Sequence, residues 1–294
     1  MGVAVGDALG AAFEGHPGPV PPAALREHLD GTGRALYTDD TALTIATAES
    51  LLDADGLDLD HLAAALAAAH HREPGRGYGA GTASLLARIQ AGGDWRPLAA
   101  GQFGGTGSFG NGAAMRSAPI ALFAGRHAVR AADLARRAAR TTHTHAVGVE
   151  GAAALAAAVA LVLGGTDPGM VAHELQVVVH DPDLRERLWA VGDLPTGESA
   201  PVVARVTGTG VSAAESVPAA IAAFVTHPDG FADTVAFAIS LGGDTDTIAS
   251  MAGALAGAHH GYRAIPEHWV ARTEGCPVLV ELADRLAARH RHDG

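Results

Sequence analysis

The stretch Gly242-Gly243-Asp244-Thr245-Asp246-Thr247 and the apolar residues that follow it decide how this chain folds. From Asp246 to His259 the apolar residues recur at three- and four-residue spacing, which predicts a helix. A second stretch of the same design, Thr38-Asp39-Asp40-Thr41, stands before another helical run from Thr41 to Leu52. Both stretches present acids where a helix begins, and this position favours the ionised form of a carboxylate.

The two acidic stretches allow two interpretations. Four carboxylates with interleaved hydroxyls form an all-oxygen ligand set suited to Mg²⁺ or Mn²⁺. Two like charges about 4 Å apart repel by roughly 4 kcal/mol at an effective dielectric of about 20, so clustered acids need protons or cations. The alternative is that Asp39 and Asp244 are N-caps with acidic neighbours, which is common at helix starts. The doubled Asp-Thr pattern favours a metal site.

Helical periodicity extends through nearly the whole chain, and stretches that alternate with a period of two are nearly absent. The segment from Gln176 to Val179 continues a helical register from Val171, so we expect helix there too. We therefore predict an all-α fold, a compact helical bundle without the period of a helical repeat. The other predicted helices are His61–His71, Thr82–Gln90, Ala128–Arg140, Val147–Leu163, Val211–Phe224, Asp233–Leu241 and Val278–His290.

Length and composition limit the class of protein. No Ser/Pro-rich linker or charge block divides the 294 residues, which predicts a single domain over residues 1–294. Apolar residues make up 48% and charged residues 18%, a balance that excludes disorder. The richest apolar segment, Ala152 to Leu163, is too short to predict a membrane span. A net charge of -12 argues against sequence-independent nucleic-acid binding, which needs a basic surface.

The start of the chain, Met1 to Asp7, has no basic segment followed by a long apolar core, so we expect no secretory signal. The single cysteine, Cys276, offers no disulfide partner and no thiolate cluster for zinc. Together these features predict a cytoplasmic location.

A Gly-rich loop, Gly104-Gly105-Thr106-Gly107-Ser108-Phe109-Gly110-Asn111-Gly112, lies between predicted helices. Its glycines allow close backbone approach to a ligand, and successive N–H groups can cradle a phosphate. Phe109 can stack on a base. The loop matches neither the Walker A pattern nor a dinucleotide-binding turn. We expect Arg116, just after it, to be a structural ion-pair partner.

Two further features have both a structural and a functional interpretation. Glu14 ends an Ala/Gly-rich helix just before the loop from Gly15 to Pro22, where it is either a solvated charge or a group that acts on a substrate. The pair His143 and His145 heads an apolar helix, and this spacing is compatible with zinc binding or with a helix cap. Of the two, we expect His145 to face the pocket.

Taken together, five stretches resemble the ADP-ribosylglycohydrolase family in their order and spacing, from residue 2 to about residue 262. This family includes the dinitrogenase-reductase-activating glycohydrolase and the ADP-ribosyl-acceptor hydrolases. The loop from Gly107 to Gly112 resembles the serine-specific branch more than the arginine-specific one. The five stretches are Gly6–Gly10, Thr38–Thr41, Gly110–Arg116, Thr144–His145 and Gly243–Ala249.

The resemblance implies an all-α, single-domain hydrolase that cleaves the N- or O-glycosidic bond between ADP-ribose and an acceptor. The acceptor is a modified protein side chain or a small ADP-ribose ester, a nucleic acid enters only as a modified substrate, and we expect a monomer. The implied ligands of two Mg²⁺ or Mn²⁺ ions match Thr38, Asp39, Asp40, Asp244, Asp246 and Thr247. The implied substrate-binding residues match Gly107, Ser108, Phe109, Gly110, Asn111 and His145. Proton transfer falls to Glu14, Asp39 or Asp40.

Two rival functions remain. One is a non-catalytic member of the same fold that binds ADP-ribose or a nucleotide, and the presence of every implied ligand weighs against it. The other is a two-metal phosphoesterase acting on a nucleotide, since two-metal oxygen sites also serve phosphoryl transfer. Release of free ADP-ribose without phosphate separates the hydrolase from the phosphoesterase.

Overall fold

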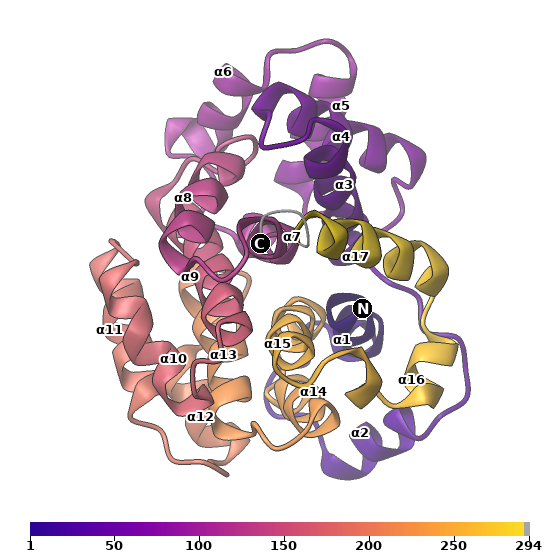
Figure 1. Cartoon of the computed structure of the whole chain (residues 1–294), viewed down its shortest axis with the longest axis vertical. Coiled ribbons are helices and arrows are strands. Elements are labelled where there is room, and N and C mark those ends of the chain that lie inside the picture. The colour runs from indigo at the N-terminus through magenta and orange to yellow at the C-terminus, as the bar shows by residue number, and fades with distance from the viewer. Residues whose placement is uncertain (291–294) are drawn as a thin grey trace.

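The computed structural model describes residues 1–290, which form only helices, turns and three isolated backbone bridges (Figure 1). The all-α prediction is confirmed for this range. The α-helices are α1 (Gly2–Gly10), α2 (Pro22–Leu29), α3 (Asp39–Asp53), α4 (Leu59–Arg72), α5 (Ala80–Gln90), α6 (Trp95–Ala100), α7 (Ala118–Ala124), α8 (Ala128–Ala139), α9 (Ala146–Leu163), α10 (Pro168–Glu174), α11 (Pro182–Gly192), α12 (Ala200–Thr207), α13 (Ala213–Thr226), α14 (Phe231–Ser240), α15 (Thr245–His260), α16 (Glu267–Arg272) and α17 (Cys276–His290). Short 3-10 helices are η1 (Ala11–Phe13), η2 (Gln102–Gly105), η3 (Asn111–Ala113), η4 (Leu175–Val177) and η5 (Tyr262–Ala264).

The helices α1 and α15 lie side by side near the middle of the molecule, although they come from opposite ends of the chain (Figure 1). Their backbones touch at glycines. A Cβ on Gly6 would lie 2.0 Å from the carbonyl oxygen of Ala249, and one on Gly253 would lie 2.2 Å from the carbonyl oxygen of Gly2. Only glycine permits this approach, which brings Asp7 of α1 close to the start of α15.

Helix α9 is the core helix of the left half of the molecule in Figure 1 and packs against α7, α8, α13 and α15. Within residues 1–290 it alone is long and apolar enough to cross a membrane, and 78% of it is buried inside the structure. Its neighbours are rich in alanine, which lets helices pack closely. Its apolar composition is therefore explained by its place in the core.

The long periodic helices were predicted correctly to within about two residues at most of their ends. The segment from Val171 to Val179 is less regular than expected, because α10 ends at Glu174 and a 3-10 turn follows. Sequence periodicity did not identify the shorter or more polar helices, which are α2, α6, α7, α11, α12 and α16.

Loops far apart in the sequence are tied together at one place by backbone hydrogen bonds. The N–H of Gly15 donates to the carbonyl of Gly243 at 2.8 Å, and the N–H of Gly243 donates to His16 at 2.9 Å. The N–H of Asp244 donates to Thr209 at 2.8 Å. These bonds fix the loop after η1 beside the start of α15, where both acidic stretches meet.

Candidate active site

The two acidic stretches come together in the fold. Asp7, Asp40 and Asp246 each offer one oxygen within 4.8 Å of the others, and Glu14, Asp244 and Asp246 form a second such group. Asp246 belongs to both groups and joins them. Among the described residues no other set of histidine, cysteine or acidic side chains converges in this way.

The N-cap interpretation of the acidic stretches does not hold. The N-cap of α3 is Thr38, whose hydroxyl accepts from the N–H of Asp40, so Asp39 is already inside the helix. Asp244 occupies the N-cap position of α15 but makes no capping hydrogen bond. Its carboxylate instead accepts from the side chain of Asn111 at 2.5 Å. Neither Asp39 nor Asp244 therefore caps its own helix through a side-chain hydrogen bond.

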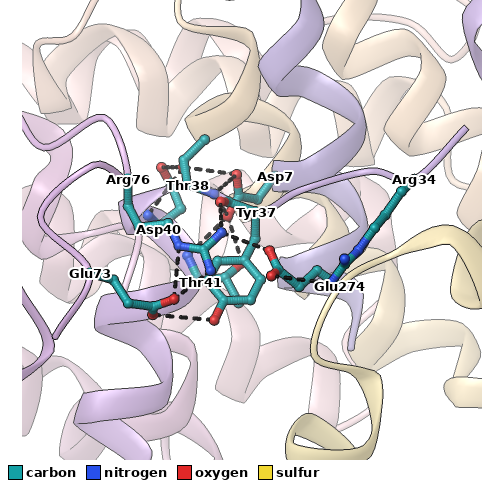
Figure 2. Close-up of polar contacts among 9 residues, drawn as sticks. All are labelled: Asp7, Arg34, Tyr37, Thr38, Asp40, Thr41, Glu73, Arg76 and Glu274. Carbon is teal, nitrogen blue, oxygen red and sulfur yellow. Dashed lines mark hydrogen bonds and ion pairs between the residues drawn. The ribbon is translucent and has the colours of Figure 1, made fainter.

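Asp7 is a member of the cluster that our sequence analysis did not single out as a site residue. It is fully buried and accepts hydrogen bonds from the backbone and hydroxyl groups of Thr38 and Thr41, with the hydroxyls at 2.8 and 2.6 Å (Figure 2). Its oxygens are thus satisfied by the first turn of α3. The signal in the sequence was a single charge within the small and apolar residues of α1.

Asp40 is 1% exposed and only half of its carboxylate has partners. Its Oδ2 lies 3.2 Å from the hydroxyls of both Thr38 and Thr247. Its Oδ1 is buried without any hydrogen-bond partner. Because an unpaired buried oxygen costs about 1–3 kcal/mol, this atom is a natural position for a cation to contact.

The carboxylates of the cluster hold protons more tightly than ordinary aspartates. Burial, reinforced by the neighbouring negative charges, raises the pKa of Asp7 and of Asp246 to about 7 and that of Asp39 to about 8. The same causes raise the pKa of Asp40 well above its usual value. Near neutral pH the cluster therefore carries protons unless cations replace them.

Glu14 lies at the solvent side of the cluster. It follows η1, its side chain is exposed, and the backbone pairing of His16 with Gly243 keeps it near Asp244. The charge of Asp246, and then burial, raise the pKa of Glu14. A carboxyl group with a raised pKa at the edge of a cavity is suited to proton transfer.

A cavity of about 400 Å³ opens beside the cluster, a volume within the range of small-molecule sites. Its wall includes Glu14, Asp39, Asp244, Asp246 and Thr247 together with loop residues from Ser108 to Gly112. Phe103 and Phe109 also line it and are 58% and 46% exposed. Their ring centroids are 6.3 Å apart, so they form an aromatic surface beside the acids.

Asn111, predicted to bind substrate, has its amide committed to the protein. It is 7% exposed and donates to Ser216 at 3.0 Å as well as to Asp244. Burial raises the pKa of Asp244, and the hydrogen bond from Asn111 opposes that rise. Asn111 therefore holds Asp244 in place and also lines the cavity, and its role in substrate binding stays a prediction.

The positions of the two histidines are the reverse of our expectation. His143 lines the cavity and is 2% exposed, and burial lowers its pKa to about 3. His145 is the N-cap of α9 and accepts from the N–H of Val147 at 3.2 Å. It lies outside the cavity wall, with its ring 6.1 Å from that of Phe109. Neither histidine belongs to the two groups of potential metal ligands.

Gly107 and Arg116 also differ from expectation. Gly107 lies outside the cavity wall, and a Cβ there would meet the hydroxyl of Thr144 at 2.1 Å, so its role is close packing. Arg116 is buried and donates to the carbonyl of Gly112 at 2.7 Å and to the hydroxyl of Thr142 at 2.8 Å. It is structural, as expected, but its hydrogen-bond partners are neutral groups rather than a carboxylate.

Comparison with known proteins gives consistent matches over the whole chain. The model of the ADP-ribosylglycohydrolase family matches residues 1–294. ADP-ribosylhydrolase ARH3 of Danio rerio is 36% identical over 328 residues, which covers 97% of this chain and 88% of the relative. The protein of the same name from Homo sapiens is 34% identical, with 97% and 90% covered. A solved structure named "ADP-ribosylglycohydrolase-related protein complex" has a TM-score of 0.77 and 31% identity, and covers 98% of this chain and 94% of that one.

Proposed function

The chain belongs to the ADP-ribosylglycohydrolase family, and from this premise we propose a hydrolase that uses divalent cations to release ADP-ribose from an acceptor. The family and the ADP-ribosylhydrolase relatives support ADP-ribose hydrolase activity. The need for cations and the nature of the acceptor are the proposed parts. The resemblance of the loop from Gly107 to Gly112 to the serine-specific branch favours an O-linked acceptor.

The donor set fits divalent cations. All side-chain donors in the cluster are oxygens, which Mg²⁺ and Mn²⁺ prefer. The buried Oδ1 of Asp40 has no partner within the protein, and the raised pKa values of the aspartates reflect charge that a cation would neutralise. We propose that the cations are held by the residues Thr38, Asp39, Asp40, Asp244, Asp246 and Thr247. Asp7, whose oxygens are already occupied, orients the first turn of α3 instead.

Bound cations would supply positive charge that acidifies a water and holds hydroxyl groups of the ribose. In the reaction, the water oxygen bonds to the anomeric carbon while the bond from that carbon to the acceptor breaks. Glu14 accepts the proton of the water and returns a proton to the leaving acceptor. Of the three predicted proton carriers, Glu14 and Asp39 line the cavity, whereas Asp40 is buried and does not. Glu14 is the exposed one, and Asp39 is proposed as a cation ligand.

The cavity next to the cluster supports binding of the ADP-ribose part. Phe103 and Phe109 offer ring faces on which an adenine can stack. Ser108, Phe109 and Gly110 line the same cavity. We propose that this loop binds phosphate oxygens through the N–H groups of Ser108 and Phe109, since the N–H of Gly110 already donates to the Ser108 hydroxyl. The protein itself carries a net charge of -12, so attraction for an anionic substrate must be local.

One observation carries the proposal: a single cavity is lined both by the acids of the two stretches and by exposed aromatic rings. The test is incubation with serine-linked, arginine-linked and acetyl-linked ADP-ribose, each in Mg²⁺, Mn²⁺ or EDTA. We expect free ADP-ribose from at least one conjugate and none in EDTA. Phosphate release instead of ADP-ribose would indicate a phosphoesterase, and tight binding without turnover would indicate a non-catalytic member of the fold.

A further inference from the structure

The guanidinium of Arg76 lies at the centre of a polar network just outside the acidic cluster (Figure 2). Its Nη1 donates to Glu274 at 2.7 Å and its Nη2 donates to Glu73 at 2.5 Å. Arg34 donates to the other carboxylate oxygen of Glu274 at 3.4 Å. The network balances two positive charges with two negative ones, and the Arg76 side chain is only 16% exposed. None of these four residues lines the cavity.

Arg76 contacts the residues on both sides of Thr38. Its Nη1 donates to the carbonyl of Tyr37 at 3.1 Å, and the guanidinium carbon lies 4.1 Å from the centre of the Tyr37 ring. Its own backbone carbonyl accepts from the N–H of Asp39 at 2.7 Å. The side chain of one arginine thus fixes the residue before Thr38, and its main chain fixes the residue after it.

Asp7 fixes the segment from Tyr37 to Thr41 as a hydrogen-bond acceptor. It accepts from the N–H and hydroxyl groups of Thr38 and Thr41, whereas Arg76 donates to the carbonyl of Tyr37. Figure 2 shows both sets of contacts. The segment from Tyr37 to Thr41 is therefore fixed through its donors and through its acceptors.

We propose that Arg76 is a positioning residue that fixes the start of α3 so that Asp39 and Asp40 meet Asp246 with the spacing that cations require. This inference rests on the proposed function. An arginine suits the task because its planar fork can serve Tyr37, Glu73 and Glu274 at once. A lysine keeps the charge but presents a single ammonium group, which cannot reproduce this set of contacts.

The network also connects the start of α3 with the loop between α16 and α17, which is distant in the sequence. The N–H of Glu274 donates to Ala35 at 3.0 Å, and a Cβ on Gly275 would lie 3.2 Å from the Tyr37 ring. On the other side of Arg76, Gly77 and Gly79 form part of the cavity wall. Arg76 therefore joins the start of α3, the cavity wall and the loop that follows α16.

The test compares Arg76→Met and Arg76→Lys with Arg136→Met. Arg136 is a matched control, because its side chain is 14% exposed and donates to Glu150 and to the backbone carbonyl of Val178, away from the cavity. For each full-length variant, Mn²⁺ affinity is measured by calorimetry and by the Mn²⁺-dependent rise in melting temperature. ADP-ribose release is then followed as a function of Mn²⁺ concentration.

We expect Arg76→Met to weaken Mn²⁺ affinity about tenfold or more, the usual effect of removing a group that orients metal ligands. The Mn²⁺ affinity of Arg76→Lys should lie between those of Arg76→Met and the wild type. Saturating Mn²⁺ should restore turnover in both Arg76 variants. Arg136→Met should lower the melting temperature without changing Mn²⁺ affinity. Should Arg76→Met fail to fold, Arg76→Lys and Glu274→Gln carry the same comparison.

Two other outcomes are distinguishable. If the wild type binds Mn²⁺ and hydrolyses a conjugate while the Arg76 variants lose stability with unchanged Mn²⁺ affinity, Arg76 is merely structural and this inference is overturned. If the wild type responds to neither Mn²⁺ nor Mg²⁺ in calorimetry or melting, the proposed function fails, and the inference fails with it.

Discussion

The substitution Asp246→Asn should make the metal-free protein more stable while it removes activity. Asp246 belongs to both groups of converging acids, so it experiences more repulsion than any single pair of carboxylates would produce. An asparagine keeps the shape of the side chain and can still accept the hydrogen bond that Asp246 receives from the N–H of Thr247 at 2.9 Å. The change therefore removes a charge with little loss of contacts.

The size of the effect follows from the pKa of Asp246, which burial and then the charge of Asp244 raise from 3.8 to about 7. A carboxyl group with a raised folded pKa binds its proton more tightly when folded, so stability falls as pH rises between these two values. At about 1.4 kcal/mol per pH unit, the folded protein at pH 8 is destabilised by about 4 kcal/mol through this group. At pH 5 the corresponding penalty is about 2 kcal/mol.

The assay is urea unfolding of the wild type and the variant in EDTA at pH 5 and pH 8. We expect Asp246→Asn to be more stable at both pH values, with the larger gain at pH 8. Mn²⁺ should stabilise the wild type but not the variant, and the variant should release no ADP-ribose. Asp229→Asn, which replaces an exposed aspartate outside the cluster, serves as a control and should change none of these results. A variant that is less stable than the wild type in EDTA at pH 8 would show that the charge of Asp246 does not destabilise the folded protein.

Three further predictions address the packing, the cavity and the core. Gly6→Ala would place a Cβ 2.0 Å from a backbone oxygen of α15 and should lower the free energy of unfolding, measured by urea titration, by about 3 kcal/mol or more. Gly33→Ala, where a Cβ would meet nothing within 4 Å, is the control and should leave this free energy unchanged. Phe109→Ala should raise KM for an ADP-ribose conjugate about tenfold in steady-state kinetics, because stacking of the adenine is lost. The Mn²⁺ requirement should not change, and an unchanged KM would mean that the adenine binds elsewhere. Burial raises the pKa of Glu150, but hydrogen bonds, led by those from Arg136, outweigh burial and leave the pKa lowered. Ionised Glu150 therefore stabilises the fold above its ordinary pKa of 4.5, and this stabilisation is lost as the pH falls below that value. Glu150→Gln should accordingly reduce the acid-induced loss of stability in melting curves below pH 5, and an identical acid profile would contradict this assignment.

Sequence periodicity predicted the helices that bury a continuous apolar face. The long helices α3, α9 and α15 have enough turns for the pattern to repeat, and they were predicted nearly to their ends. The helices α6 and α16 each have six residues, too few for a periodic pattern to be distinguished from chance. Helix α11 is longer, but its charged residues interrupt the apolar pattern.

The same contrast applies to the candidate site. Asp39, Asp40, Asp244 and Asp246 were found because acids gathered at a helix start are a local feature of the sequence. Asp7 has no acidic neighbour in the sequence, and its role arises from the close approach of α1 to α3 and α15. Such a role depends on tertiary contacts that no local pattern encodes.

The positions of side chains around the cavity were beyond local reasoning for a related reason. His143 and His145 are two residues apart, and which of them faces the cavity depends on how the loop before α9 turns. The contacts of Arg76 join three segments from different parts of the chain, so no local pattern indicated them. Residue types can be assigned a chemistry from sequence, but their orientation requires the fold.

A crystal grown in Mn²⁺ and measured at the manganese absorption edge would show whether cations bind the acidic cluster. We expect anomalous density in contact with Asp40 Oδ1, the buried oxygen that has no partner in the protein, and with Asp246. Absence of anomalous density there, with Asp40 and Asp246 hydrogen-bonded only to each other or to water, would contradict this expectation.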